Sequence, residues 1–173
     1  LEEIVEERTK RLQDVTNAIL NVLEKATSIS DEVTGNHIQR VSAYSELLAK
    51  EALLPHEIIS ELKAYSPLHD IGKIGISESI LKKPGPLTTE EFEKMKEHVN
   101  IGSELLREAK LPEIAVNIIK YHHEKWNGKG YCEGLSKNDI PIEARIVSIA
   151  DVFDALTTER PYKKAFSIEE AIR

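Results

Sequence analysis

The stretch Tyr121-His122-His123-Glu124-Lys125-Trp126-Asn127-Gly128-Lys129-Gly130-Tyr131 decides how the chain is interpreted. Two adjacent histidines stand where a helical pattern runs out into a glycine-rich loop, and glycine just beyond a helix is a usual stop signal. Neighbouring helical residues diverge by about 100°, but at a helix end both imidazoles can still converge on one ligand. Imidazole is the commonest side-chain metal ligand, so the pair predicts half of a metal site. A pair of partly exposed polar residues beside a loop is the alternative that this stretch leaves equally open.

Composition bounds the class of protein. The 173 residues suffice for one domain with a real core, and 40% apolar with 31% charged residues is ordinary for a soluble protein. The net charge of -7 argues against a nucleic-acid polymer as partner, which needs a basic face. The single cysteine, Cys132, excludes an internal disulfide and suits a reducing cytoplasm. No apolar run approaches the ~18 residues of a membrane span, so we expect a cytoplasmic segment without membrane contact.

Residues 1–29 carry a heptad pattern with charged residues between the apolar positions. These positions are Leu1, Val5, Leu12, Val15, Ile19, Val22 and Ala26. Their spacing predicts a parallel dimeric coiled coil, and an amphipathic helix packed on its own domain is the alternative. Because the chain begins at Leu1 and stops inside a helical pattern, we expect a piece of a longer protein. A sensor or receiver domain would precede this signalling helix, and such a protein could be membrane-anchored through its N-terminal part.

Residues 30–173 show only helical patterns, and the alternation of a strand is missing. We predict an all-α domain with helices over about 35–51, from Pro55, over about 89–109, from Pro112 to the histidine pair, over 141–157 and from Ser167. Thr88 and Glu91 have the spacing of a capping box. We take His56 as an exposed residue. In the helix over 89–109, we expect an apolar face directed toward the core, made of Phe92, Met95, Val99, Ile101, Leu105 and Leu106.

Five of the six histidines stand at predicted helix ends or in apolar surroundings, together with two aspartates. They are His37, His69, Asp70, His98, His122, His123 and Asp151. A buried carboxylate must be paired or metal-bound, although an exposed Asp151 is the commoner case for a single aspartate. One ion takes about four protein ligands, so this set suits two ions bridged by a carboxylate. Mixed nitrogen and oxygen ligands favour iron, manganese or zinc over calcium or magnesium.

Several further motifs accompany this set in a fixed order. They are His69-Asp70-Ile71-Gly72-Lys73, Leu81-Lys82-Lys83-Pro84-Gly85, the His122-His123-Glu124 loop ending in Gly130-Tyr131, Ala150-Asp151-Val152-Phe153-Asp154-Ala155-Leu156 and Arg160-Pro161-Tyr162. Together they resemble the HD-GYP family, whose members are HD-superfamily phosphodiesterases that open the bacterial second messenger cyclic di-GMP. The resemblance covers about residues 30–173 and implies an HD-type helical bundle.

The resemblance also implies roles for individual residues. Asp70 would bridge two ions, one held also by His37, His69 and Asp151 and the other by His98, His122 and His123. Iron or manganese is favoured, with zinc, nickel and cobalt as further candidates. A metal-bridging hydroxide would open one phosphodiester to give pGpG, with GMP as a conceivable later product. Lys73 would contact the scissile phosphate and help to protonate the leaving oxygen. Substrate contacts would come from Lys73, Lys83, Gly130, Tyr131, Arg160 and Lys163.

Three positions depart from the family pattern. Cys132 replaces the proline that ends the name motif, which frees a backbone N–H and loosens the turn. Val33 stands where some members carry a glutamate that recruits a third metal, and Glu32 is one residue off, so we expect two ions. Lys163 stands where arginine is common, which loses bidentate phosphate recognition and keeps the charge.

Two other functions stay open. The chain could be a sensor that binds cyclic di-GMP without hydrolysing it, which the Cys132 variant makes conceivable and the complete ligand set opposes. It could also be an HD-superfamily phosphohydrolase of another nucleotide, although that does not account for the loop ending in Gly130-Tyr131. Comparing binding with turnover separates the sensor from the enzyme.

Overall fold

The computed structural model describes residues 4, 5, 7–11, 15, 18, 19, 22, 37–159 and 164–172. All regular structure in these residues is helical, as the sequence predicts. Most of the predicted coiled-coil helix lies outside the described residues, so the homodimer through this helix stays a prediction. The same holds for Glu32 and Val33 and the expected absence of a third metal. In the described ranges, no helix is both long and apolar enough to cross a membrane.

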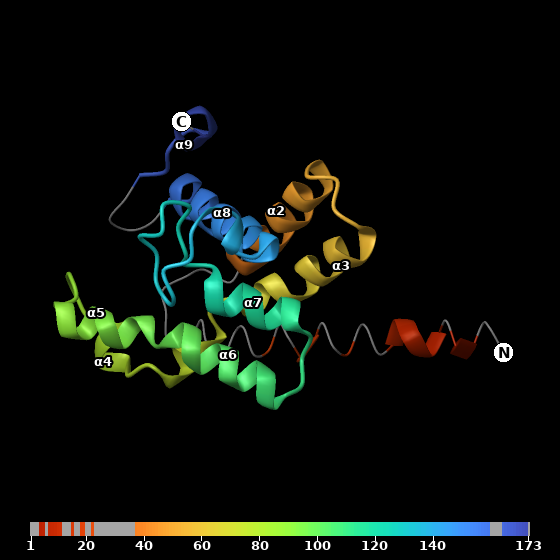
Figure 1. Cartoon of the computed structure of the whole chain (residues 1–173), viewed down its shortest axis with the longest axis horizontal. Coiled ribbons are helices and arrows are strands. Elements are labelled where there is room, and N and C mark those ends of the chain that lie inside the picture. Colours follow the sequence, from red (N-terminus) through yellow and green to blue (C-terminus); the bar gives the residue numbers. More distant parts are fainter. Residues whose placement is uncertain are drawn as a thin grey trace.

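Four helices form the main bundle: α2 (His37–Glu51), α3 (His56–Tyr65), α7 (Glu113–Tyr121) and α8 (Ile142–Thr157). Helix α2 packs against α3 and α8, and α7 packs against α3 and α8 (Figure 1). Pro55, Pro112 and Pro141 are the N-cap residues of α3, α7 and α8. Proline has no N–H to satisfy and a fixed φ, which suits the start of a helix and explains three of the predicted boundaries. His56 is exposed, as predicted.

Helix α7 is buried on almost every side because it serves two hydrophobic clusters. Its Ile114 and Ile118 pack with residues of α2, α3 and α8. Its Ala115, Val116 and Ile119 pack with Leu106 and with the segment around residues 68–71. Only a narrow polar stripe of Glu113, Asn117 and Lys120 is left on its remaining side. The end of α7, where the histidine pair follows, is therefore held between the two clusters.

Two short 3₁₀ helices, η1 (Ser66–Leu68) and η2 (Ile71–Gly75), and the short α4 (Glu78–Leu81) follow α3. His69 and Asp70 lie in the turn between η1 and η2. A Cβ added at Gly72 would lie 1.8 Å from the carbonyl oxygen of His98, so only glycine lets η2 approach the next helix this closely. This close contact brings the His69-Asp70 turn next to His98.

The helix predicted over 89–109 is in fact two helices, α5 (Thr89–Lys96) and α6 (His98–Glu108). The N–H of Glu97 bonds back to the carbonyl of Lys94, which tightens the chain into a turn at Glu97. The predicted capping box of Thr88 with Glu91 is confirmed.

Two of the residues expected in the core of this segment are on the surface. Val99 and Leu106 are buried, but Phe92 is 44% exposed and Leu105 is 40% exposed. Helix α5 has no buried residue, because it extends beyond the bundle (Figure 1). An apolar pattern shows which residues share a helix face, and the end of the packing partner decides whether that face is covered.

The remaining elements are η3 (Lys137–Asp139) in the loop after α7 and the short α9 (Ile168–Ile172). Ser167 and Glu170 exchange backbone-to-side-chain hydrogen bonds across the first turn of α9, as the sequence predicts. Helix α9 contacts α8.

Candidate metal centre

The structure brings the seven predicted metal ligands into two adjoining groups. His37 and His98 are the first residues of α2 and α6, and Asp151 lies within α8. The turn after η1 supplies His69 and Asp70, and the end of α7 supplies His122 and His123. Most of these residues lie at helix ends, which is why sequence signals for helix ends found them, although their side chains are buried.

The first group contains His37, His69 and Asp151, whose ligand atoms lie within 4.8 Å of one another. Asp151 Oδ1 lies 3.4 Å from His37 Nε2 and 4.0 Å from His69 Nε2. Both imidazoles are buried, and Asp151 is partly buried. Two imidazoles and one carboxylate leave room around an ion for a further ligand.

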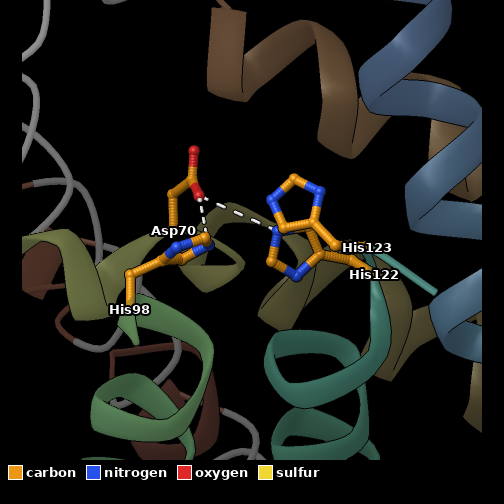
Figure 2. A group of neighbouring side chains, drawn as sticks. All are labelled: Asp70, His98, His122 and His123. Atoms are coloured by element: carbon orange, nitrogen blue, oxygen red, sulfur yellow. Dashed lines mark ion pairs between the residues drawn. The ribbon is translucent and has the colours of Figure 1, made fainter. Parts of the chain in front are cut away.

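The second group contains Asp70, His98, His122 and His123, again within 4.8 Å (Figure 2). Asp70 Oδ1 lies 3.4 Å from His98 Nε2 and 3.8 Å from His122 Nε2. Its other oxygen, Oδ2, lies 3.5 Å from Nε2 of His69 in the first group. Asp70 therefore faces both groups, one oxygen toward each, which is the position that a bridging carboxylate needs.

The ring nitrogens that face away from the site are held by hydrogen bonds. Nδ1 of His69 donates to the carbonyl of Ser66 over 2.9 Å, Nδ1 of His98 to that of Met95 over 2.7 Å, and Nδ1 of His122 to that of Ile119 over 2.9 Å. A carbonyl only accepts, so each Nδ1 carries the proton. In the neutral imidazole the lone pair of each Nε2 then points into the site, which is the tautomer that a metal ligand requires.

The inward-facing atoms fit a metal because the protein leaves them without a hydrogen-bond partner. Nε2 of His69, His98 and His122 and Oδ1 of Asp70 are all buried and unpartnered. Buried polar atoms are satisfied in more than nine cases out of ten. Four orphaned acceptor atoms at one place are costly unless cations occupy the site. These His/Asp clusters therefore suggest a dinuclear metal site.

Sequence reasoning missed the side chains that hold His37. Asp154 is 1% exposed, and its Oδ2 accepts from Nδ1 of His37 over 2.6 Å. Arg40 binds the same carboxylate with both Nε, at 2.5 Å, and Nη2, at 2.9 Å. Such carboxylate–histidine pairs orient metal-binding imidazoles. Two spacings pointed to this contact: His37 with Arg40 and Asp151 with Asp154 each lie three residues apart, on one helix face.

Lys73 sits beside the bridging position. Its Nζ lies 2.8 Å from Asp70 Oδ2. Burial disfavours the charged form of Asp70, but the neighbouring Lys73 and His69 outweigh it and hold the pKa of Asp70 well below its usual range. Burial lowers the pKa of His98 to about 4, so this imidazole is neutral at neutral pH. A charged Asp70 carboxylate beside a neutral His98 imidazole is a protonation state that binds a cation.

The loop after the histidine pair folds back onto it through Glu124. Glu124 is buried, and its Oε1 accepts the backbone N–H groups of Cys132, Glu133 and Gly134 over 3.3, 2.7 and 2.9 Å. The backbone N–H of Cys132, which a proline at this position would lack, therefore donates a hydrogen bond in this loop. A Cβ at Gly130 would lie 2.4 Å from the Cα of Glu124, so the loop closes this tightly only with glycine there. This role of Glu124 was also missed, because it depends on the path of the loop.

Tyr131 reaches the centre at the end of this loop. Its ring stacks on that of His123 with 4.7 Å between centroids and 28° between planes. Burial raises the pKa of Tyr131, which keeps its phenol protonated. Of the predicted phosphate contacts, Lys83 forms an ion pair with Glu91. Arg160 and Lys163 lie outside the described residues.

Comparisons with known proteins agree with this architecture. Residues 21–173 match the model of the HD domain family. A relative named cyclic di-GMP phosphodiesterase from Thermotoga maritima is 41% identical over 100% of this chain and 48% of its own length. A relative from Vibrio cholerae, named 3'3'-cGAMP-specific phosphodiesterase 2, is 42% identical over 92% of this chain and 31% of its own. The chain thus spans less than half the length of these relatives.

A solved structure supports the fold. The crystal structure of a cyclic GMP-AMP-specific phosphodiesterase of Vibrio cholerae superposes with a TM-score of 0.67 at 23% identity. The superposition covers 90% of this chain and 42% of the chain in that crystal structure. Together with the paired His/Asp groups, the match over residues 21–173 establishes that this chain belongs to the HD domain family.

Proposed function

We propose that the chain is the catalytic part of a metal-dependent phosphodiesterase that hydrolyses a cyclic dinucleotide, with cyclic di-GMP as the first candidate and pGpG as its product. The observation that carries the proposal is the position of Asp70 between two groups of imidazoles, with one oxygen toward each. Relatives named for cyclic di-GMP and for 3'3'-cGAMP support the substrate class.

The two groups would hold one ion each, with Asp70 shared between them. Nitrogen-rich ligands with carboxylates suit iron or manganese, and also zinc, nickel and cobalt. Two ions held this way supply Lewis acidity toward a phosphodiester and its attacking water. The remaining chemistry falls to side chains of this protein.

Lys73 is the side chain placed to serve the reaction. In the structure its ammonium contacts Asp70 Oδ2, at the edge of both groups. From there it would contact a non-bridging oxygen of the scissile phosphate and donate a proton to the leaving 3'-oxygen. A cation that is already fixed in place stabilises negative charge as it develops and needs no rearrangement. Lys83, Arg160 and Lys163 would provide further phosphate contacts, and Gly130 with Tyr131 would shape the adjoining loop.

Chromatography of the products tests the proposal directly. Protein prepared without oxygen and loaded with iron or manganese should convert cyclic di-GMP to pGpG, and added chelator should stop the reaction. GMP as the main product would weaken the assignment of two ions. Binding of intact cyclic di-GMP by metal-loaded protein without turnover would favour the sensor. If the metal-loaded protein neither binds nor hydrolyses cyclic di-GMP, another nucleotide would be tested as its substrate.

A further inference from the structure

A series of ring contacts leads from the metal centre to the surface at α5. The ring of His123 stacks on Tyr131, and Tyr131 contacts Phe92 edge-to-face with 6.1 Å between centroids. Phe92 ends the series and is 44% exposed. It belongs to neither hydrophobic cluster of the bundle. A single exposed apolar residue is ordinary on a protein surface, and what distinguishes Phe92 is that its ring continues this series from the candidate metal centre.

A lysine one turn later stands over the same rings. Lys96 Nζ lies 5.0 Å from the ring centroid of Phe92 and 5.7 Å from that of Tyr131. Its ion pair with Glu93, at 2.6 Å, occupies one of its three N–H groups. We call Phe92, Lys96 and the outer edge of Tyr131 the α5 face. It combines two aromatic rings with an ammonium group that lies over both of them.

We propose that the α5 face binds one purine base of the cyclic dinucleotide and favours guanine over adenine. The inference rests on the proposed function and deepens it. The aromatic surface accepts any base by stacking. Discrimination would come from Lys96, whose ammonium a stacked base would displace from the ring face toward the edge of the base. Guanine offers two neighbouring acceptors there, O6 and N7, whereas adenine offers N7 beside an amino group that donates. The ring of Phe92 is separated from the candidate metal ligand His123 only by the ring of Tyr131. A single nucleotide could therefore place its phosphate at the metal centre and its base on Phe92.

Kinetics with three substrates test the α5 face. Manganese-loaded wild type, Phe92→Leu, Phe92→Trp and Lys96→Met would be assayed for kcat/KM on cyclic di-GMP, 3'3'-cGAMP and cyclic di-AMP. Loss of stacking in Phe92→Leu should lower kcat/KM for all three substrates by roughly 5- to 100-fold. Phe92→Trp keeps an aromatic ring at this position and should retain a kcat/KM close to that of the wild type. Lys96→Met should lower kcat/KM for cyclic di-GMP more than for cyclic di-AMP. Leu105→Ala, at a similarly exposed apolar residue of α6, is the matched control and should leave kcat/KM unchanged for all three substrates.

Binding and metal content separate the ways of failing. The Kd of a slowly hydrolysed phosphorothioate analogue of cyclic di-GMP should rise in Phe92→Leu by the same factor as kcat/KM falls, with metal content unchanged. Active wild type with an equally active Phe92→Leu would overturn the α5 face and leave the proposed function standing. An unchanged ratio between guanine and adenine substrates in Lys96→Met would overturn the base preference. A wild type that neither binds nor hydrolyses any of the three would overturn both proposals.

Discussion

The two ligand groups are held in different ways. In the second group, the imidazoles of His98 and His122 are fixed by main-chain carbonyls three residues earlier, so each is positioned by the backbone immediately before it. In the first group, His69 is held in the same local way by the carbonyl of Ser66, but His37 is fixed by the side chain of Asp154, 117 residues away. Local anchoring depends only on a helix that forms, whereas distant anchoring depends on the packing of α2 against α8. The first group should therefore be the more easily disturbed of the two.

Asp70 belongs to both groups, so its loss should have the largest effect. We expect Asp70→Ala to reduce hydrolysis of cyclic di-GMP to background, because both ions would lose a ligand and Lys73 would lose its contact with Asp70. His69→Ala should also abolish turnover. Product chromatography and metal analysis would be run on the same samples, with circular dichroism to verify folding. A folded Asp70→Ala protein with full activity would rule out the proposed two-ion arrangement.

Asp154→Asn should affect the first group selectively. The substitution keeps the size of the side chain but removes the charge that holds His37 and pairs with Arg40. Loss of such an orienting partner typically weakens metal affinity about 10- to 100-fold. Metal titration should show one weakened site and one unchanged site. Asp139→Asn, at an exposed aspartate, is the control. Equal weakening of both sites would show that the two groups do not differ in the way described.

The metal-free protein should lose stability as the pH falls. Burial lowers the pKa of His98 to about 4 in the folded state, against about 6.5 in an unfolded chain. The unfolded state binds more protons between these values, so stability is fully present above pH 6.5 and is lost as the pH falls toward 4. For His98 alone the loss is on the order of 3 kcal/mol. Urea unfolding at several pH values would measure it.

The variant His98→Leu should flatten this dependence, since it removes a group that must be uncharged in the fold. His56→Gln, at an exposed histidine, should leave it as in the wild type. An unchanged slope in His98→Leu would mean that other groups dominate the acid sensitivity.

The smallest effect is expected for Cys132→Pro, which restores the residue of the family motif. Proline removes the hydrogen bond from the Cys132 N–H to Glu124, a loss of about 1 kcal/mol, and gains about 0.4–1 kcal/mol by restricting the unfolded chain. The two nearly cancel, so the urea midpoint and kcat should stay close to wild type. A large loss of either would show that this N–H controls the loop.

The sequence predicted the features that depend on local signals. Helix starts at Pro55, Pro112 and Pro141, the Thr88–Glu91 capping box and the all-helical class are of this kind. The candidate ligands were found because histidines at helix ends are unusual in a helical core. What the structure adds is tertiary: the contact of Asp154 with His37 and the loop bonds to Glu124 join residues whose own neighbourhoods do not specify a partner.

The break at Glu97 and the exposure of Phe92 were missed for the same reason. The continuous helical pattern over 89–109 contains no proline, and its one glycine, Gly102, lies five residues after the turn and does not mark it. The turn lies where the close approach of Gly72 to the His98 carbonyl fixes the start of α6. The apolar pattern of α5 was read as a core face, although the bundle ends before it (Figure 1).

The link between His37 and Asp154 also has a consequence for how the protein is made. During synthesis, the ribosome releases the N-terminal part of the domain first, and His37 emerges long before Asp151 and Asp154. The first group cannot close around an ion until α8 has left the exit tunnel. Metal binding is coupled to folding when the site exists only in the folded chain. An ion would therefore enter the first group only after α8 has been made, because a nascent chain that ends before α8 lacks Asp151 and cannot complete this group.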